Sequence, residues 1–294
     1  MAKKQRISSR RARRITMDII VHVFLSIVAI VWVMPFVYLI GQSLRNTGFD
    51  GMDTTSFFPE KYGFQNYVRL FTETGTVNFP RMFMNTFIVA SCSCVIGSFF
   101  VLAVSYSLSR LKWKMRKPYM NMGMVITLFP GFMSMTATYF LLKAMGLTSG
   151  SNILLGLIIC NCSGAGVGFH VMKGYMDTIP KALDEAAYLD GATKWQTYIR
   201  ITLPLCKPMI VYQVVTAFMG PWCDFIFAKL ICRDNKDFYT VSIGLWDMVM
   251  KMDSVNTYFT RFCAGAVVVA IPISILFMIT QRFYQEAMSG SVKG

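Results

Sequence analysis

Charged side chains are scarce in this sequence. Only 15% of its 294 residues are Asp, Glu, Lys or Arg, whereas soluble domains carry about a quarter. The shortage argues against an ordinary soluble domain, and a hydrophobic fraction of 54% with a mean hydropathy of +0.48 favours a membrane protein. Histidine is scarce as well, with two in the whole chain. Because no nucleophile–base pair or metal-ligand cluster stands out, we do not expect an enzyme.

Two patterns that would hold a cofactor are also missing. There is no phosphate-binding loop of the form G-x4-G-K-[ST], so any use of ATP requires a separate ATPase chain. The eight cysteines fall mostly within apolar runs, and none has the spacing of zinc ligands. We therefore expect this chain to bind no cofactor and no metal, and to form no disulfide framework.

The positive charge of the chain is concentrated at its start. The formal net charge is +14, and seven Lys and Arg lie within the first 14 residues. Such a cluster suggests nucleic acid as a partner, but no aromatic side chain interleaves the basic ones. The apolar run 19–40 that follows has the length of a membrane-spanning helix, about 20 residues, rather than that of a signal-peptide core. We expect a cytoplasmic anchor that faces lipid, and no nucleic-acid partner.

Six apolar stretches are long enough to span a bilayer, which predicts an all-α integral membrane protein. The expected spans are about 19–41, 85–108, 119–144, 151–173, 205–231 and 262–283. A basic tail (1–18) precedes this transmembrane domain (19–283), which includes a polar loop at 177–204, and a short tail (284–294) follows it. Breaks are expected in the third span at Pro130-Gly131 and in the fifth at Gly220-Pro221, because membrane helices tolerate such residues.

The distribution of basic residues predicts the orientation in the membrane. With the N-terminus inside, the inner segments hold 19 Lys and Arg against 6 acids, and the remainder of the chain holds 10 against 9. This asymmetry places both termini and the 177–204 loop in the cytoplasm. The two outer segments, about 42–84 and 232–261, either contact an external partner or cap the bundle.

The 177–204 loop is predicted to fold as a helix, a turn and a second helix. Thr178 is expected to cap the first helix, with Pro180 in its first turn. Gly191 is expected to end it in a left-handed conformation. Thr193 and Gln196 have the spacing of a capping box at the start of the second helix.

One face of the first helix is small and shallow. By helical spacing it carries Leu183, Ala186, Ala187 and Asp190. Small residues allow close approach, so the face suits docking into a groove on a partner. An interfacial helix on lipid and an ordinary connector remain alternatives, although the first lacks large apolar residues and the second is long at about 30 residues.

The spacing Glu185-Ala186-Ala187, Gly191 and Ile201-x-Leu203-Pro204 resembles the EAA signature, E-A-A-x3-G-x9-I-x-L-P, of the membrane subunits of binding-protein-dependent ABC importers. The resemblance implies the type I importer permease fold, with this loop as the coupling helix on an ATPase subunit. It also implies that the EAA residues and Gly191 transmit ATP-driven closure, through packing against the fourth and fifth spans. Expected partners are a second permease, an ATPase dimer that uses ATP, and an extracytoplasmic solute-binding protein.

The likeness covers nearly the whole chain and is greatest to the smaller permease subunit of maltose and maltodextrin transporters. "EAAYLDGATKWQTY", "KGYMDTIP" and the ending "GSVKG" carry it. It implies a bacterial inner-membrane, multi-pass permease for maltodextrin-type oligosaccharides, although the particular sugar is not specified. A stand-alone secondary transporter or channel is the alternative, but firm acids and bases at midspan are absent.

Two further groups of residues are candidates for function. Asp224 in the fifth span is an acid where charge is costly, and Asn161 in the fourth span is polar; both are candidates for a substrate path. Placement at the headgroup level and interhelical hydrogen bonding are the respective structural alternatives. The resemblance implies that the tail residues Ser291, Val292, Lys293 and Gly294 contact the ATPase.

Overall fold

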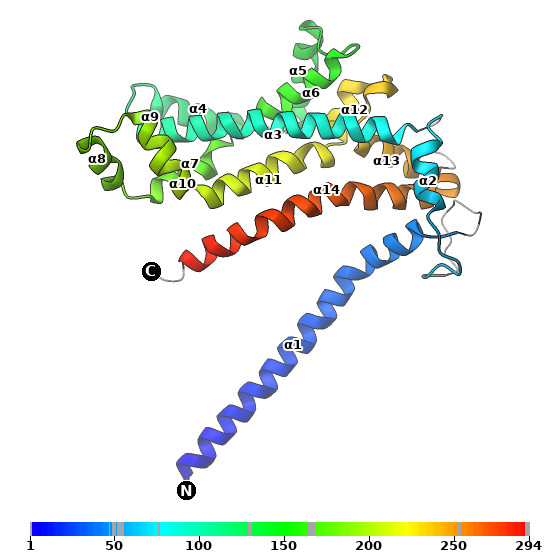
Figure 1. Cartoon of the computed structure of the whole chain (residues 1–294), viewed down its shortest axis with the longest axis horizontal. Coiled ribbons are helices and arrows are strands. Elements are labelled where there is room, and N and C mark those ends of the chain that lie inside the picture. Colours follow the sequence, from blue (N-terminus) through cyan, green and yellow to red (C-terminus); the bar gives the residue numbers. More distant parts are fainter. Residues whose placement is uncertain are drawn as a thin grey trace.

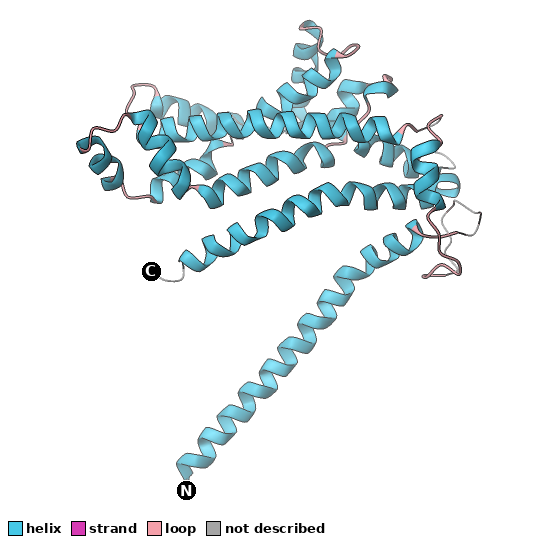
Figure 2. Ribbon diagram, in the orientation of Figure 1, coloured by secondary structure: helices cyan, strands magenta, loops and turns pink. Residues whose placement is uncertain are grey.

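The computed structural model describes residues 2–46, 48, 51, 56–75, 77–128, 131–163, 168–251 and 254–291, without the side chains of 2–14, 127, 132, 254–256 and 284–291. Within these ranges the chain is helical, and its one β-type contact is an isolated bridge between Arg45 and Tyr62 (Figure 2). This confirms the all-α prediction. The elements are α1 (Ala2–Ser43), α2 (Gln65–Thr72), α3 (Phe79–Arg110), α4 (Arg116–Thr127), α5 (Gly131–Ala144), α6 (Asn152–Ser163), α7 (Phe169–Thr178), α8 (Ala182–Leu189), α9 (Lys194–Thr197), the π-helix η2 (Tyr198–Thr202), α10 (Leu203–Leu205), α11 (Lys207–Cys223), α12 (Ile226–Cys232), the 3₁₀ turn η3 (Lys236–Phe238), α13 (Val241–Met250) and α14 (Ser254–Ser291).

Three of the described helices are long and apolar enough to cross a membrane by themselves. They are Ile15–Ser43 within α1, all of α3, and Thr257–Phe283 within α14. A fourth crossing is obtained if Lys194–Leu205 and Lys207–Cys223 are counted as one span bent by 80°. Two of the other expected spans are occupied by pairs of shorter helices, α4 with α5 and α6 with α7. The number of crossings therefore stays a prediction.

Helix α3 is the central element of the bundle. It packs against α11, α7 and α6 along its length, and against α13 and η3 near its start. Buried apolar side chains from α3 take part in all three hydrophobic clusters, including Val89, Ala90 and Val101. Its 32 residues make it about 48 Å long, and its one proline lies at the start, where the missing N–H is harmless.

The two ends of the bundle differ in what they carry. Figure 1 shows α8 and α9 at one end of α3, and α2 and α13 at the other. The C-terminal end of α14 points toward the α8 end, and α1 runs back from α2 in the same general direction (Figure 1). The described ends of α1 and α14 therefore lie toward the same end of the bundle as the polar loop, and the side of the membrane on which they lie stays a prediction.

Helix α1 is the exception to this compact packing. It contacts α14 near its own C-terminal end and then diverges from the bundle (Figure 1). Every described side chain from Ile15 to Val37 is exposed, and most of them are apolar. Such a helix requires a lipid or protein surface to cover it.

The break in the fifth span was predicted at the wrong residue. Helix α11 continues through Gly220 and Pro221 and ends at Cys223, so the interruption lies at Asp224 and Phe225. Pro221 removes only one hydrogen-bond donor, and a membrane helix tolerates that loss. The helix ends before Asp224, because the carboxylate and the carbonyl of Asp224 accept hydrogen bonds from Phe227 and Ser242 instead. In the third span, α4 ends at Thr127 and α5 begins at Gly131, but Pro130 is outside the described residues.

Candidate functional site

The first half of the polar loop forms α8, an eight-residue helix. Asp184 and Glu185 lie in its first turn, where their charge is favourable to the helix dipole. The predicted cap by Thr178 is wrong, because Thr178 ends α7 and donates to the Tyr175 carbonyl at 2.7 Å. Pro180 lies two residues before α8 rather than in its first turn, and Ile179 is extended, as residues before a proline prefer.

The turn after α8 matches its prediction. Gly191 has φ +81°, the left-handed conformation expected there. The Ala192 N–H donates to the Ala187 carbonyl at 2.9 Å, and the Gly191 N–H donates to the Tyr188 carbonyl at 3.1 Å. These two bonds make a Schellman motif, which fixes the direction in which the chain leaves α8.

The second half of the loop begins with the predicted capping box. The Thr193 hydroxyl accepts from the Gln196 N–H at 3.2 Å, and the Gln196 side chain accepts from the Thr193 N–H at 2.8 Å. The helix then widens into η2, passes Pro204 and bends by 80° at Cys206 before α11 begins. The polar hairpin is therefore angled sharply against the fifth span.

The orientation of α8 differs from the one expected from its small residues. Asp184 and Ala187 are its buried residues, whereas Leu183, Ala186 and Asp190 are exposed. The predicted single face is thus divided, with Ala187 turned inward. The physical reason is Asp184, whose carboxylate is drawn to an arginine on α3.

That arginine is Arg110, the last residue of α3. Its Nε lies 3.2 Å from Asp184 Oδ2, and the two side chains are 2% and 8% exposed. Its Nη2 donates to the carbonyl oxygens of Met176 and Ile179, both at 2.9 Å. One guanidinium therefore holds the end of α7, the link to α8 and α8 itself.

Two more side chains near the end of α3 bind the loop. Tyr106 donates its hydroxyl proton to the Lys194 carbonyl at 3.0 Å, and Ser109 donates to Asp177 Oδ1 at 2.6 Å. Burial of Asp177 opposes ionisation, but hydrogen bonds from Lys173 and Ser109 and nearby positive charge outweigh it. The pKa of Asp177 is consequently below its usual value.

The exposed side of α8 contains a residue that sequence reasoning missed. Leu189 is 89% exposed at the tip of the helix. The exposed residues between positions 182 and 190 are Ala182, Leu183, Glu185, Ala186, Tyr188, Leu189 and Asp190. Leu189 falls inside the EAA spacing and its apolar character was visible, whereas nothing local in the sequence indicated that Arg110 pairs with Asp184.

The two substrate-path candidates make structural contacts. Asp224 Oδ1 accepts from the Phe227 N–H at 3.2 Å, which caps the start of α12, and its carbonyl accepts from Ser242 at 2.6 Å. Asn161 donates to the Leu157 carbonyl at 2.9 Å within α6. A Cβ on Gly220 would be 3.8 Å from Asn161 Oδ1, so α6 and α11 are close at this level. A role of either residue in transport stays a prediction.

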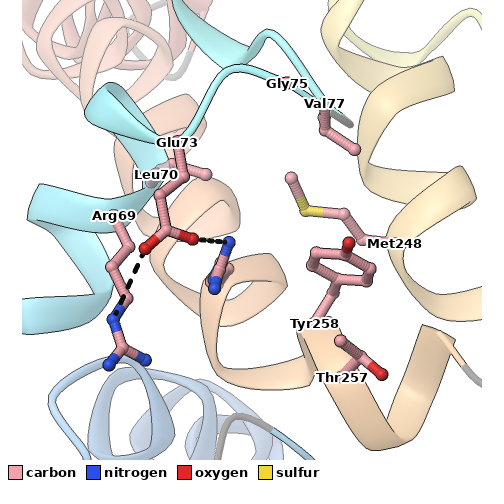
Figure 3. Close-up of a pocket in the computed structure, with 9 residues that line it drawn as sticks. Arg69, Leu70, Glu73, Gly75, Val77, Met248, Thr257 and Tyr258 are labelled. Atoms are coloured by element: carbon pink, nitrogen blue, oxygen red, sulfur yellow. Dashed lines mark ion pairs between the residues drawn. The ribbon is translucent and has the colours of Figure 1, made fainter.

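A pocket of about 260 Å³ lies at the opposite end of the bundle from α8. Glu73, on the link after α2, lies between two arginines, with Arg69 Nε at 3.8 Å and Arg261 Nη1 of α14 at 2.6 Å. Figure 3 shows Arg69 and Glu73 together at one side of this pocket. The volume is below the roughly 300 Å³ at which ligand pockets begin, and its acid is already paired. We interpret it as a clamp between α2 and α14.

The predicted tail contact and the expected absence of a metal site can be compared only with the described residues. Val292, Lys293 and Gly294 lie outside them, as does the side chain of Ser291, so the tail contact with an ATPase is untested. Among the described residues, no group of three or more His, Cys, Asp or Glu is arranged to hold a metal ion.

Comparison with known proteins identifies relatives along nearly the whole chain. A family model described as the binding-protein-dependent transport system inner membrane component matches residues 1–290. The galactooligosaccharides transport system permease protein GanQ of Bacillus subtilis is 28% identical over 98% of this chain and 100% of its own length. The maltodextrin transport system permease protein MalD of Streptococcus pneumoniae is 30% identical over 98% of this chain and 99% of its own.

A solved structure shares the fold. It is a bacterial ABC transporter involved in the import of the acidic polysaccharide alginate, and one of its chains aligns with a TM-score of 0.73. The alignment covers 91% of this chain and 96% of that chain at 20% identity. The architecture predicted from the sequence is thereby confirmed.

Proposed function

The chain belongs to the family of binding-protein-dependent transport system inner membrane components, and from that premise we propose that it is the permease subunit of an ATP-driven oligosaccharide importer. The observation that carries the proposal is the α8–α9 hairpin, which protrudes from one end of an apolar bundle (Figure 1). Its EAA residues Glu185 and Ala186 are exposed. An exposed, capped hairpin with an exposed leucine, Leu189, at the end of its first helix suits a groove on another subunit.

The mechanism follows from how the hairpin is built. ATP binding closes a dimer of separate ATPase subunits, and α8, seated in one of them, moves with it. The Schellman turn and the capping box keep the hairpin rigid, so that it acts as a lever. The bundle then changes from an inward-open to an outward-open state, and hydrolysis resets it. Leu183, Ala186 and Leu189 are the contacts that we assign to the ATPase groove, with Gly191 as the turn that orients them.

A second permease subunit is the partner that we assign to α1. A shallow apolar cavity of about 670 Å³ lies between α1 and the following loop, lined by Ile30, Val33, Val37, Phe57 and Phe58. Lipid can cover an isolated α1, but a cavity of this kind is filled better by side chains of a homologous bundle. The rest of the apolar α1 surface faces the bilayer.

The cargo is an oligosaccharide, and the maltodextrin class is the one we favour. This rests on relatives named for maltodextrin and for galactooligosaccharides, and on the alginate transporter, whose structure in complex with an alginate pentasaccharide-bound periplasmic protein is also similar in fold. An extracytoplasmic solute-binding protein would deliver the sugar to the α2 and α13 end. Asp224 and Asn161 are the residues of this chain that we place nearest the path.

The location we propose is the bacterial inner membrane, with the α8 end and both termini in the cytoplasm. The basic residues of the first 14 positions would then face anionic lipid headgroups. The tail from Ser291 to Gly294 would lie against the ATPase dimer, which carries out the hydrolysis that this chain does not.

Reconstitution tests this proposal. The chain is placed in proteoliposomes with a second permease, an ATPase and a solute-binding protein from the same organism, and uptake of labelled maltodextrin is measured with and without ATP. Uptake that requires all four components and ATP is the expected result. Flux driven by an ion gradient through this chain alone would instead establish the secondary transporter, an alternative that the relatives do not support.

A further inference from the structure

Three polar side chains lie on one face of the last two turns of α3. Each binds a different part of the segment that comprises the end of α7 and the α8–α9 hairpin, which we call the coupling hairpin. Tyr106, Ser109 and Arg110 have the i, i+3, i+4 spacing of one helical face. They hold α9, the end of α7 and α8 respectively, through the contacts described above. All of the hairpin's segments are therefore tied to one end of one helix.

This attachment is stiff because it is buried. Tyr106 and Ser109 are 7% and 1% exposed, and the Arg110–Asp184 pair is shielded from water on both sides. A buried ion pair is screened little by salt, and separating it leaves two unpaired charges in a poor solvent. Tyr106 also belongs to an apolar cluster with Val101, Met172 and Tyr198.

The other connections from the hairpin to the bundle are less direct. Toward α11 the chain passes a π-helix and an 80° bend at Cys206. Toward α7 it passes the non-helical link Ile179–Lys181, and the Ile179 carbonyl is itself held by Arg110. A bend and an extended link can both absorb displacement, whereas an uninterrupted helix such as α3 is stiffer along its length.

The opposite end of α3 is anchored as well. Asn85 donates to the carbonyl oxygens of Asp237 and Tyr239 at 2.9 and 3.1 Å, and Thr86 accepts from the Val241 N–H at 2.8 Å. These contacts fasten α3 to η3 and the start of α13. One uninterrupted helix thus connects the hairpin with the far surface of the protein.

We propose that α3, joined to α8 by the buried Arg110–Asp184 pair, is the element through which movement of the coupling hairpin reaches the rest of the bundle. Arg110 is a positioning residue in this scheme, because it acts on transport through α8 and α3 and not on the cargo. The inference rests on the proposed function. The sequence led us to expect that movement passes from the loop to the fourth and fifth spans, whereas here α3, in the second expected span, is the main route.

The test replaces the ion pair by an apolar pair of similar size. The double variant Arg110→Met/Asp184→Leu leaves no buried charge unpaired, and such replacements are commonly neutral for folding. The control is Lys251→Met/Asp247→Leu, which removes an i, i+4 pair at the end of α13, far from the hairpin. Because the solute-binding protein is placed at that end, the control is read through ATPase binding and sugar taken up per ATP hydrolysed, and not through the KM for the solute-binding protein. Each variant is assembled with its partner subunits and solute-binding protein, and assembly, ATP hydrolysis and maltodextrin uptake are measured.

The expected result is a loss of coupling at constant assembly. In the Arg110→Met/Asp184→Leu transporter, sugar taken up per ATP hydrolysed falls by about fivefold or more, the lower range of allosteric coupling. Binding of the ATPase subunits and the KM for the liganded solute-binding protein stay within about twofold of the wild-type values. The control keeps the wild-type ratio.

Two results would overturn the proposal. One is a wild-type ratio of sugar to ATP in the double variant. The other is loss of ATPase binding in the double variant while the single variant Arg110→Lys, which keeps the charge and loses the planar fork, binds and couples normally. That pattern would mean that the pair only shapes the docking surface. Failure of the proposed function is distinguishable, because the wild-type assembly itself would then show no ATP-dependent uptake.

Discussion

The turn at Gly191 offers a test in which backbone strain is separated from steric crowding. Its φ of +81° is disfavoured for any residue with a Cβ, yet a Cβ placed there would meet no atom within 4 Å. Gly191→Val therefore adds strain without a clash. The left-handed conformation costs an L-residue about 1–2 kcal/mol, and a β-branched residue is at the upper end.

That cost translates into a change in the population of the native turn. About 1–2 kcal/mol corresponds to a factor of roughly 5–30 in an equilibrium. The Schellman bonds from Ala192 and Gly191 are weakened by the same amount, so α8 and α9 lose their fixed angle. We expect ATP-dependent uptake to fall by about 5–30-fold, while ATP hydrolysis by the assembled complex falls less. Gly191→Asn should be close to wild type, because asparagine tolerates this conformation.

A matched control exists in the turn between α5 and α6. Gly146 has φ +72°, a Cβ placed there would likewise meet no atom within 4 Å, and the same pair of bonds forms, from Gly146 to Lys143 and from Leu147 to Leu142. Gly146→Val imposes equal strain away from α8. It should lower the melting temperature as much as Gly191→Val does, with the sugar-to-ATP ratio unchanged. Equal loss of coupling in both variants would refute the assignment of the hairpin as lever.

Three further predictions follow from the two sides of α8 and from Asp177. Leu189→Asp should weaken ATPase binding in co-purification by about tenfold or more, since burial of a leucine contributes about 1.5–3 kcal/mol, whereas Phe64→Asp, an exposed apolar site near α2, should not. Ala186→Trp, on the exposed side, should block ATPase binding without changing the melting temperature. Ala187→Trp, on the buried side, should lower the melting temperature, because overpacking costs about 1–3 kcal/mol of stability. The reverse pattern would contradict the orientation of α8. Asp177→Asn should make the melting temperature fall less steeply as the pH is lowered. The lowered pKa of native Asp177 contributes stability that is present above the unfolded pKa of about 4 and is lost as the pH falls through the native pKa. A melting temperature that falls with acid as steeply as in the wild type would contradict this role.

The parts of this structure that sequence could predict are the ones encoded within a few residues. The left-handed Gly191 and the capping box of Thr193 and Gln196 depend on contacts three to five residues apart. The break in the fifth span did not follow the local rule. Pro221 stays within α11, and the chain turns only where Asp224 binds Phe227 and Ser242, the latter 18 residues further on in α13.

The orientation of α8 shows most clearly why local reasoning was insufficient. A helix of eight residues is too short to be stable by itself, and burial of a single alanine gains little. A carboxylate that can reach a buried arginine decides the matter, because neither charge tolerates burial alone. With Asp184 turned to Arg110, Ala187 must follow inward by helical spacing and Leu189 must point to solvent.

The same argument explains why the apolar replacement of this pair is informative. Leucine at position 184 and methionine at position 110 would also prefer the interior, so α8 should keep its orientation and its docking side. What the replacement removes is the link itself: the guanidinium lies against the Asp184 carboxylate through Nε and donates from Nη2 to the Met176 and Ile179 carbonyls, whereas two apolar side chains can slide past each other. A hairpin that still docks, yet slips against α3, would hydrolyse ATP without moving the bundle. Uptake per ATP therefore reports on the joint itself.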